Sequence, residues 1–163
     1  MQIVIVSDSP EQVGALCALA LDAGLKQVQG FNHPAAALDW CAEHQPDLVL
    51  ADHMMRACDG LEFLRRFRAM PHLAEVPVLL MLPQVAGLAR VRSLAWKLGA
   101  TDFLNLPVDS TEFVARLRTL LLLREALRAR PLAAAFADRS LEAANSHWLD
   151  VPASGRPGLA QFH

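Results

Sequence analysis

The chain has 163 residues, with 15 Lys and Arg against 17 Asp and Glu, and a formal charge of -2. This length fits one domain of about 100 to 150 residues with an extension and excludes two full domains. Because the net charge is close to zero, the chain as a whole has no electrostatic attraction to nucleic acid or anionic lipid. We therefore expect no direct nucleic-acid binding.

Three further features bear on the cellular location. The N-terminal stretch "MQIVIVSDSP" lacks a basic segment and reaches an acid after a short apolar run, unlike a secretory signal. No apolar run approaches the ~20 residues of a membrane-spanning helix. The three cysteines show no metal-ligand spacing, which is typical of free thiols in a reducing compartment. The sequence therefore predicts a cytoplasmic protein without membrane insertion.

Five short apolar runs alternate with longer segments of helical period, which predicts parallel strands joined by helices. Three of the runs are almost continuously apolar, which is typical of central strands covered on both faces. The predicted strands cover residues 3–6, 26–30, 48–51, 76–82 and 101–105.

The segments between the strands carry the start and stop signals of helices. In chain order these are Ser9 and Pro10 at the first helix and Gly24 at its end, Pro34 at the second, Gly60 at the third, Gly99 after the fourth, and "DSTE" at 109–112 before the fifth. The order of elements predicts a flavodoxin-like doubly wound α/β fold. Its five-stranded parallel sheet has the order 2-1-3-4-5, with helices on both faces. We expect the domain to cover residues 1–125, a helical extension 126–150 and a flexible tail 151–163.

Two acids follow neighbouring strands of this predicted sheet. Asp8 follows the first strand and Asp52 ends the third, and the carboxyl ends of these strands flank the switch point where ligands bind. Two close carboxylates repel each other unless they share a proton or hold a divalent cation. Such a site suits Mg²⁺ and phosphoryl chemistry.

Four segments carry a resemblance to a known family: "IVIVSDSPEQ", "PDLVLADHMMRACDGLEFLRRFR", "VPVLLML" and "LGATDFLNLPV". In order and spacing they resemble the receiver domain of two-component response regulators. The resemblance implies that Asp52 accepts a phosphoryl group from a histidine kinase or phosphotransfer protein. It also implies a weak Mg²⁺ site at Asp8, Asp52 and the backbone carbonyl of Met54. The family's "DG" before the third helix matches Asp59 and Gly60. No enzymatic activity is implied beyond self-phosphorylation and dephosphorylation at an Asp.

Four positions of the site depart from the family pattern. Ser7 replaces an acid, Leu82 replaces a Ser or Thr, Leu106 replaces a Lys, and the switch aromatic is Phe103, which has no hydroxyl. Phosphoryl transfer depends on positioning and on neutralising charge over the transferring oxygens. Loss of the cation and the hydroxyl therefore predicts weak or absent phosphorylation at Asp52.

Two interpretations of Asp52 stay open: a phosphoacceptor, or a strand-end acid in a scaffold that is no longer phosphorylated. The adjacent His53 is expected to point to the opposite face of the strand, which favours packing or a surface hydrogen bond over a role as a base.

Apolar residues outside the predicted core stripes indicate a contact surface. At 100° per residue, Trp96 points away from the stripe of the fourth helix, and Leu122 and Leu123 lie outside the stripe of the fifth. Exposed anchors of this kind are enriched at interfaces. We expect a partner here, including a second copy through the fourth and fifth helices; alternatively, the C-terminal extension folds back over them. The predicted stripe of the fourth helix contains Leu88, Val91, Leu94, Ala95 and Leu98, and that of the fifth Phe113, Val114, Leu117, Leu120 and Leu121.

Three functions follow from these features. The first is a receiver that acts through contacts with a kinase, phosphotransfer protein or effector, with little phosphorylation. The second is a working phosphoacceptor that uses Asp8, Asp52 and Mg²⁺. The third is a flavodoxin-like cofactor binder, which the loop "SDSPEQ" disfavours because it places an acid where a phosphate cradle needs Gly or hydroxyl donors.

Overall fold

The computed structural model describes the backbone of residues 1–149 and the side chains of residues 1–129. These residues divide into two compact units, Met1–Glu125 and a second that begins at Ala126, and each is described by itself. The predicted tail at 151–163 lies outside the described residues. Within the described part, no helix has both the length and the apolar character to cross a bilayer.

The first unit is built on a five-stranded parallel sheet. The strand order is β2-β1-β3-β4-β5, and each neighbouring pair is parallel. This order confirms the flavodoxin-like fold predicted from the sequence and places β1 beside β3. The strands are β1 (Gln2–Val6), β2 (Gln27–Phe31), β3 (Leu48–Asp52), β4 (Val78–Pro83) and β5 (Asp102–Leu106).

The helices begin and end at the signals read in the sequence. The Ser9 side chain accepts a hydrogen bond from the Gln12 N–H at the start of α1, and Gly99 ends α4 in the left-handed region at φ +94°. The last helix continues without a break through the predicted extension. The helices are α1 (Pro10–Asp22), α2 (Pro34–Glu43), α3 (Gly60–Arg68), a 3₁₀ turn η1 (Pro71–Leu73), α4 (Ala89–Leu98) and α5 (Ser110–Leu149).

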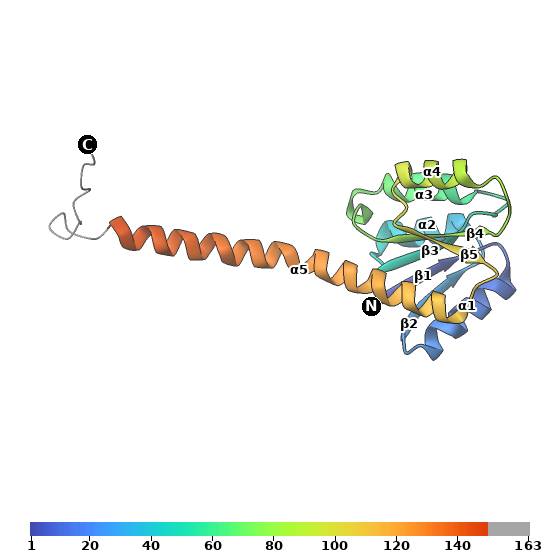
Figure 1. Cartoon of the computed structure of the whole chain (residues 1–163), viewed down its shortest axis with the longest axis horizontal. Helices are drawn as coiled ribbons and strands as arrows, with labels where there is room; N and C mark the ends of the chain where they lie inside the picture. Colours follow the sequence, from blue (N-terminus) through green and yellow to red (C-terminus); the bar gives the residue numbers. More distant parts are fainter. Residues whose placement is uncertain (150–163) are drawn as a thin grey trace, which may run out of the picture. The chain divides into compact units, whose positions relative to one another are not determined.

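The core of the first unit consists of two apolar clusters, one on each face of the sheet. Helices α2, α3 and α4 cover one face, while α1 and the first turns of α5 cover the other (Figure 1). Along β3, Val49 and Ala51 join the first cluster and Leu48 and Leu50 the second, so the whole strand is buried. The carboxyl ends of β1 and β3 therefore lie side by side at one edge of the sheet.

One predicted core position of α4 is wrong. Leu94 is 40% exposed, and the only buried residue of α4 is Ala95. Leu88, Val91 and Leu98 are partly buried and pack against the core. These residues and Ala95 form an i, i+3, i+7, i+10 row, and Leu94 lies to one side of the arc they cover. The narrow buried arc leaves Leu94 in solvent together with Trp96, which is 52% exposed.

Candidate functional site

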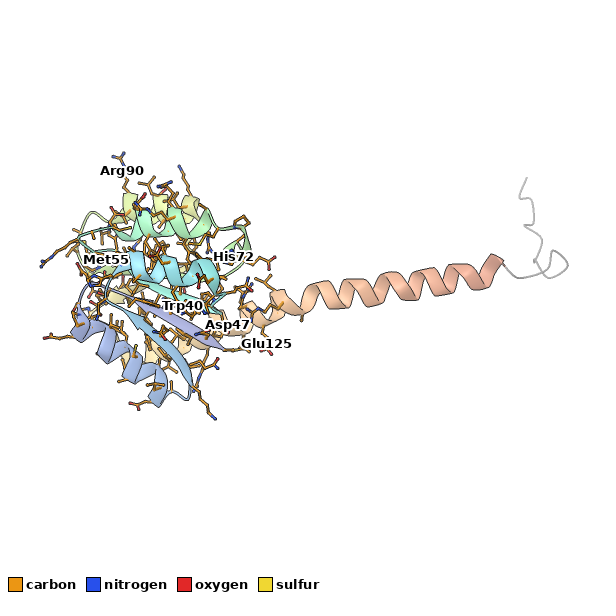
Figure 2. All side chains as sticks on the ribbon, turned by 180° about the vertical axis from the view of Figure 1, so that it is seen from behind. Trp40, Asp47, Met55, His72, Arg90 and Glu125 are labelled. Carbon is orange, nitrogen blue, oxygen red and sulfur yellow. The ribbon has the colours of Figure 1, made fainter. Side chains whose placement is uncertain are left out.

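Asp52 lies at the carboxyl end of β3, in the middle of the sheet. It is 4% exposed and pairs in register with Met81 on β4. The next residue, His53, donates its N–H to the Met81 carbonyl at 2.9 Å, which holds the chain close to β4 beyond the end of the strand. Met55, which follows β3, and Asp47, which precedes it, lie at opposite ends of the unit (Figure 2).

Both oxygens of the Asp52 carboxylate accept hydrogen bonds from the protein. The Ser7 hydroxyl donates to Oδ2 at 3.0 Å, and the Met54 N–H donates to Oδ1 at 2.9 Å. Ser7 is fully buried, and its Oγ also accepts the Ser9 N–H at 3.3 Å. The residue that replaces a family acid is thus a neutral donor to the predicted acceptor. Each carboxylate oxygen keeps a free lone pair, because an ionised Asp has about four acceptor positions.

Asp8 is partly buried in the loop after β1 and is tied to the loop after β3. Its Oδ2 accepts the Arg56 N–H at 3.0 Å. The link between Asp8 and Asp52 therefore runs through the segment that contains Met54 and Arg56. The structure brings the predicted metal-binding residues to one edge of the sheet, as parallel neighbours require.

A divalent cation at this edge of the sheet would need several oxygen atoms as ligands. Within the described residues, no three His, Cys, Asp or Glu side chains form a group that could hold a metal. Two carboxylates, Asp8 and Asp52, and a backbone carbonyl such as that of Met54 remain as oxygen donors. Mg²⁺ prefers oxygen ligands and usually keeps several waters. These residues fit a hard cation that is held weakly, because at most two negatively charged side chains, Asp8 and Asp52, would contact it.

The neighbouring strand ends present apolar side chains. Leu82 is the next-to-last residue of β4, in register with Asn105. Its side chain is fully buried and belongs to the cluster under α2, α3 and α4. Leu106 ends β5 and packs against the opposite cluster. Neither side chain has a polar atom that could contact a phosphoryl oxygen.

A cation near the end of β5 is already engaged. Arg92 on α4 donates to Asn105 Oδ1 at 2.7 Å, and its guanidinium lies 5.1 Å from the centroid of the Phe103 ring. Phe103 is 6% exposed and meets the Trp96 ring edge to face, with centroids 5.0 Å apart. Phe103 is therefore held between a cation and an aromatic ring of the same helix.

The start of α3 packs directly on the backbone that carries the acceptor. Asp59 caps the helix by accepting the Leu61 and Glu62 N–H groups at 2.9 Å. The Gly60 N–H donates to the His53 carbonyl, and a Cβ on Gly60 would lie 2.7 Å from His53 Cα and 2.9 Å from the Asp52 carbonyl oxygen. Asp59 is thus required as the helix cap, and Gly60 is required because the two backbones approach too closely for a side chain.

The His53 ring is partly buried, and its Nδ1 has no partner within the described residues.

A hollow beside Asp8 is lined by residues that are not among the predicted site residues. It has a volume of about 480 Å³ at the carboxyl ends of β1, β2 and β3. Arg56, Asn32 and His33 could have been found, because each follows a predicted strand of the sheet within a few residues. The lining residues are Asp8, Ser9, Asn32, His33, Pro34, Arg56 and Ala57.

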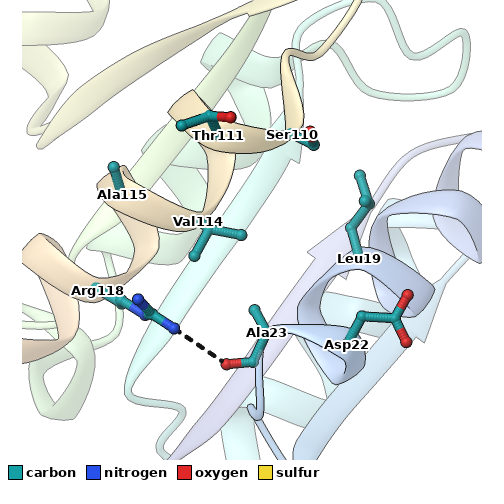
Figure 3. Close-up of a pocket in the computed structure, with 8 residues that line it drawn as sticks. All are labelled: Leu19, Asp22, Ala23, Ser110, Thr111, Val114, Ala115 and Arg118. Atoms are coloured by element: carbon teal, nitrogen blue, oxygen red, sulfur yellow. Dashed lines mark hydrogen bonds between the residues drawn. The ribbon is translucent and has the colours of Figure 1, made fainter.

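A second hollow, of about 440 Å³, lies between the end of α1 and the first turns of α5 (Figure 3). Arg118 crosses it and donates to the Ala23 carbonyl at 3.5 Å. It contains none of the predicted site residues. Its lining residues are Leu19, Asp22, Ala23, Ser110, Thr111, Val114, Ala115 and Arg118.

The apolar side chains predicted to contact a partner are exposed. Trp96 is 52%, Leu122 66% and Leu123 44% exposed, and Leu94, which like Trp96 is on α4, is 40% exposed. Their role as a partner interface stays a prediction.

The fold and this edge of the sheet define a class of signalling module. The family model of the response regulator receiver domain matches residues 3–118, and the chain belongs to that family. It is therefore a receiver domain of two-component signalling, as the resemblance implied.

Particular relatives show how much of a longer protein the chain matches. It is 38% identical over 99 residues to the cyclic di-GMP phosphodiesterase response regulator RpfG of Xanthomonas campestris pv. campestris (strain 8004), which covers 61% of this chain and 26% of RpfG. It is 32% identical over 121 residues to the transcriptional regulatory protein PcoR of Escherichia coli, which covers 74% of this chain and 52% of PcoR. The chain thus spans about a quarter to a half of these relatives.

Solved structures agree on the fold. The signal receiver domain of a signal transduction histidine kinase from Syntrophus aciditrophicus has a TM-score of 0.66 and 27% identity, and the match covers 74% of this chain and 89% of that one. Chemotaxis protein CheY4 of Vibrio cholerae, at 20% identity and a TM-score of 0.67, shares the fold over 73% of this chain and 97% of its own.

Proposed function

We propose that this chain is an atypical receiver that acts through protein–protein contacts, with weak or no phosphorylation at Asp52. The observation that carries the proposal is that groups of the protein itself already donate hydrogen bonds to the Asp52 carboxylate. Its carboxylate is 4% exposed and accepts from the Ser7 hydroxyl and the Met54 N–H. A carboxylate already solvated by internal donors needs neither a metal nor a phosphoryl group to be stable in this position.

The chemistry of phosphoryl transfer supports the same proposal. An Asp52 oxygen would form a bond to phosphorus while the bond from phosphorus to the donor's imidazole nitrogen breaks, and that nitrogen would then take a proton. Charge on the transferring oxygens must be neutralised during this step. Leu82 and Leu106 offer no donor, and Arg92 is engaged by Asn105 and Phe103. Loss of one preorganised donor typically costs about 2.7 to 4 kcal/mol, or about 10² to 10³ in rate.

The partners in this proposal are a histidine kinase, a phosphotransfer protein or an effector. Trp96 and Leu94 on α4 supply exposed apolar area for such a contact. The names of RpfG and PcoR refer to different outputs, so only the receiver role is carried over to this chain. We infer no catalytic turnover other than self-phosphorylation and dephosphorylation. The free cysteines among the described residues agree with a cytoplasmic location.

A second candidate function is a working phosphoacceptor that uses Asp8, Asp52 and Mg²⁺. One observation favours it: the hollow beside Asp8 is also lined by Arg56, which brings a cationic side chain to this edge of the sheet. Mg²⁺, when bound, would supply charge neutralisation, and Asp8 and Asp52 would hold it. The third candidate, a flavodoxin-like cofactor binder, gains no support from the family match.

One experiment separates the first two candidates. The chain is incubated with Mg²⁺ and a small phosphodonor or beryllofluoride, and adducts are followed by intact mass and amide NMR spectra. We expect no stoichiometric adduct with the native sequence. A matched variant, Leu82→Thr with Leu106→Lys, should form one, because it returns the hydroxyl and the cation.

Asp52→Asn is the control in both backgrounds and should abolish any specific adduct. A stoichiometric adduct of the native chain that disappears in Asp52→Asn, with spectral shifts that reach Phe103, would establish the working acceptor instead. Circular dichroism of the double variant checks that Leu82→Thr, a substitution in the core, leaves the fold intact.

A further inference from the structure

Helix α5 carries two apolar stripes that follow one another along the chain. The first packs against the sheet and includes Phe113, Leu117 and Leu121, all buried. The second begins at Leu122 and Leu123, which are 66% and 44% exposed. The first unit therefore leaves the beginning of the second stripe in solvent.

The sequence continues this second stripe with the spacing of a coiled coil. Steps of four and three residues from position 123 meet 127, 130, 134, 137, 141, 144 and 148, which are apolar except for Arg130. The adjacent row from position 122 is apolar except at 140 and 147. Glu and Arg occupy positions 125, 128, 139 and 142 on the other side. An apolar repeat of 3.5 residues is the pattern by which two helices bury a shared seam.

The second unit offers nothing else to cover this stripe within the described residues. There the only element is the continuation of α5 from Ala126 to Leu149. In proteins most helical stability comes from packing of the apolar face against another element, so an uncovered apolar stripe is unfavourable in water. A second helix packed along the stripe would bury it and stabilise α5.

We propose that α5 pairs with α5 of a second copy of this chain along the stripe that begins at Leu122 and Leu123. A second copy fits because it carries the same stripe, and identical patches meet across a two-fold axis. The many Ala residues of the stripe let two helix backbones approach closely, while the Leu residues at its start supply the larger buried area. This seam lies on α5, whereas Trp96 is on α4.

The test is the mass of the full chain in solution, measured by light scattering after gel filtration over a range of concentrations. We expect a dimer for the native sequence and a monomer for Leu123→Arg with Leu127→Arg. The matched control Glu125→Arg places the same side chain on the exposed opposite side and should remain a dimer. Helical circular dichroism should fall on dissociation, while amide spectra of the first unit stay native, since Leu123 lies outside its core.

Two outcomes would overturn the pairing. The first is a native chain that is monomeric at every concentration. The second is a dimer that survives Leu123→Arg with Leu127→Arg but dissociates in Trp96→Ala, which would assign self-association to α4. Asp52→Asn should leave the dimer intact, so this result is independent of the phosphorylation experiment.

Discussion

The Ser7 hydroxyl is the residue-scale feature that most alters the acceptor edge. It donates to Asp52 Oδ2 from a fully buried position, where a hydrogen bond to a charged group contributes about 1.5 to 3 kcal/mol. In a receiver of the family pattern this position holds an acid that would repel Asp52. Here the repulsion is replaced by a donor, and β1 is joined to β3 by a side-chain bond.

Removal of this donor should therefore destabilise the fold. We expect Ser7→Ala to lower the free energy of unfolding by roughly 1 to 3 kcal/mol, because Asp52 keeps its burial but loses one of two donors. Urea unfolding measures this change. In the Asp52→Asn background the same substitution should cost less, since the acceptor is no longer charged. An equal loss in both backgrounds would show that Ser7 acts independently of Asp52.

At the scale of elements, the junction between β3 and α3 fixes the acceptor loop. Gly60 brings the first turn of α3 against the backbone of Asp52 and His53, with no room for a side chain. By contrast, Gly14 lies on the exposed face of α1, and a Cβ added there would meet no atom within 4 Å.

These two glycines form a matched pair for a stability measurement. Gly60→Ala should destabilise the protein by about 1 to 3 kcal/mol, because the helix start must move away from the strand end. Gly14→Ala should stabilise it by roughly 0.5 to 1 kcal/mol, because Ala loses less backbone entropy in a helix. Thermal and urea unfolding of both variants measure the difference. A neutral Gly60→Ala would contradict close packing at this junction.

The sequence predicted the elements well because their signals are local. Buried runs such as 48–51, and helix-start signals such as Ser9 and Gly60, act within a few residues, so the sheet order and helix starts agree with the structure. Leu94 was mispredicted because the arc that α4 buries depends on how the helix sits on its neighbours, which no local pattern encodes.

The site was predictable only in part, for a related reason. Strand order alone brings the loops after β1 and β3 together, and thus Asp8 near the segment after Asp52. The hydrogen bond from Ser7 to Asp52 depends on strand register and side-chain rotamers, which the sequence does not display. The engagement of Arg92 by Phe103 and Asn105 likewise joins an α4 residue to β5 across the tertiary structure.

At the scale of the whole molecule, a buried thiol couples stability to alkaline pH. Burial raises the pKa of Cys41 from its ordinary 9.0 to about 12. Below pH 9 the thiol is neutral in both the folded and unfolded states, and its contribution to stability is complete. Between about pH 9 and 12 the unfolded chain releases this proton while the folded chain retains it, so stability falls as pH rises.

Chemical denaturation below and above pH 9 tests this coupling. The native chain should lose more stability across that range than Cys41→Ala, which has no thiol to ionise. The variant will be less stable at every pH because of the lost side-chain volume, so the slopes and not the absolute values are compared. Identical slopes would assign the alkaline loss to other groups.

The contact between Trp96 and Phe103 has an optical consequence. Trp96 is half in solvent, yet its ring touches Phe103, a buried aromatic residue of β5 that also contacts Arg92. Its fluorescence should therefore change both when a partner covers α4 and when Phe103 moves. Trp40, stacked on His44 at 4.2 Å, lies on α2 and would add a signal from another part of the unit. With Trp40→Phe and Trp148→Phe in place, the chain becomes a single-emitter sensor of its own docking surface.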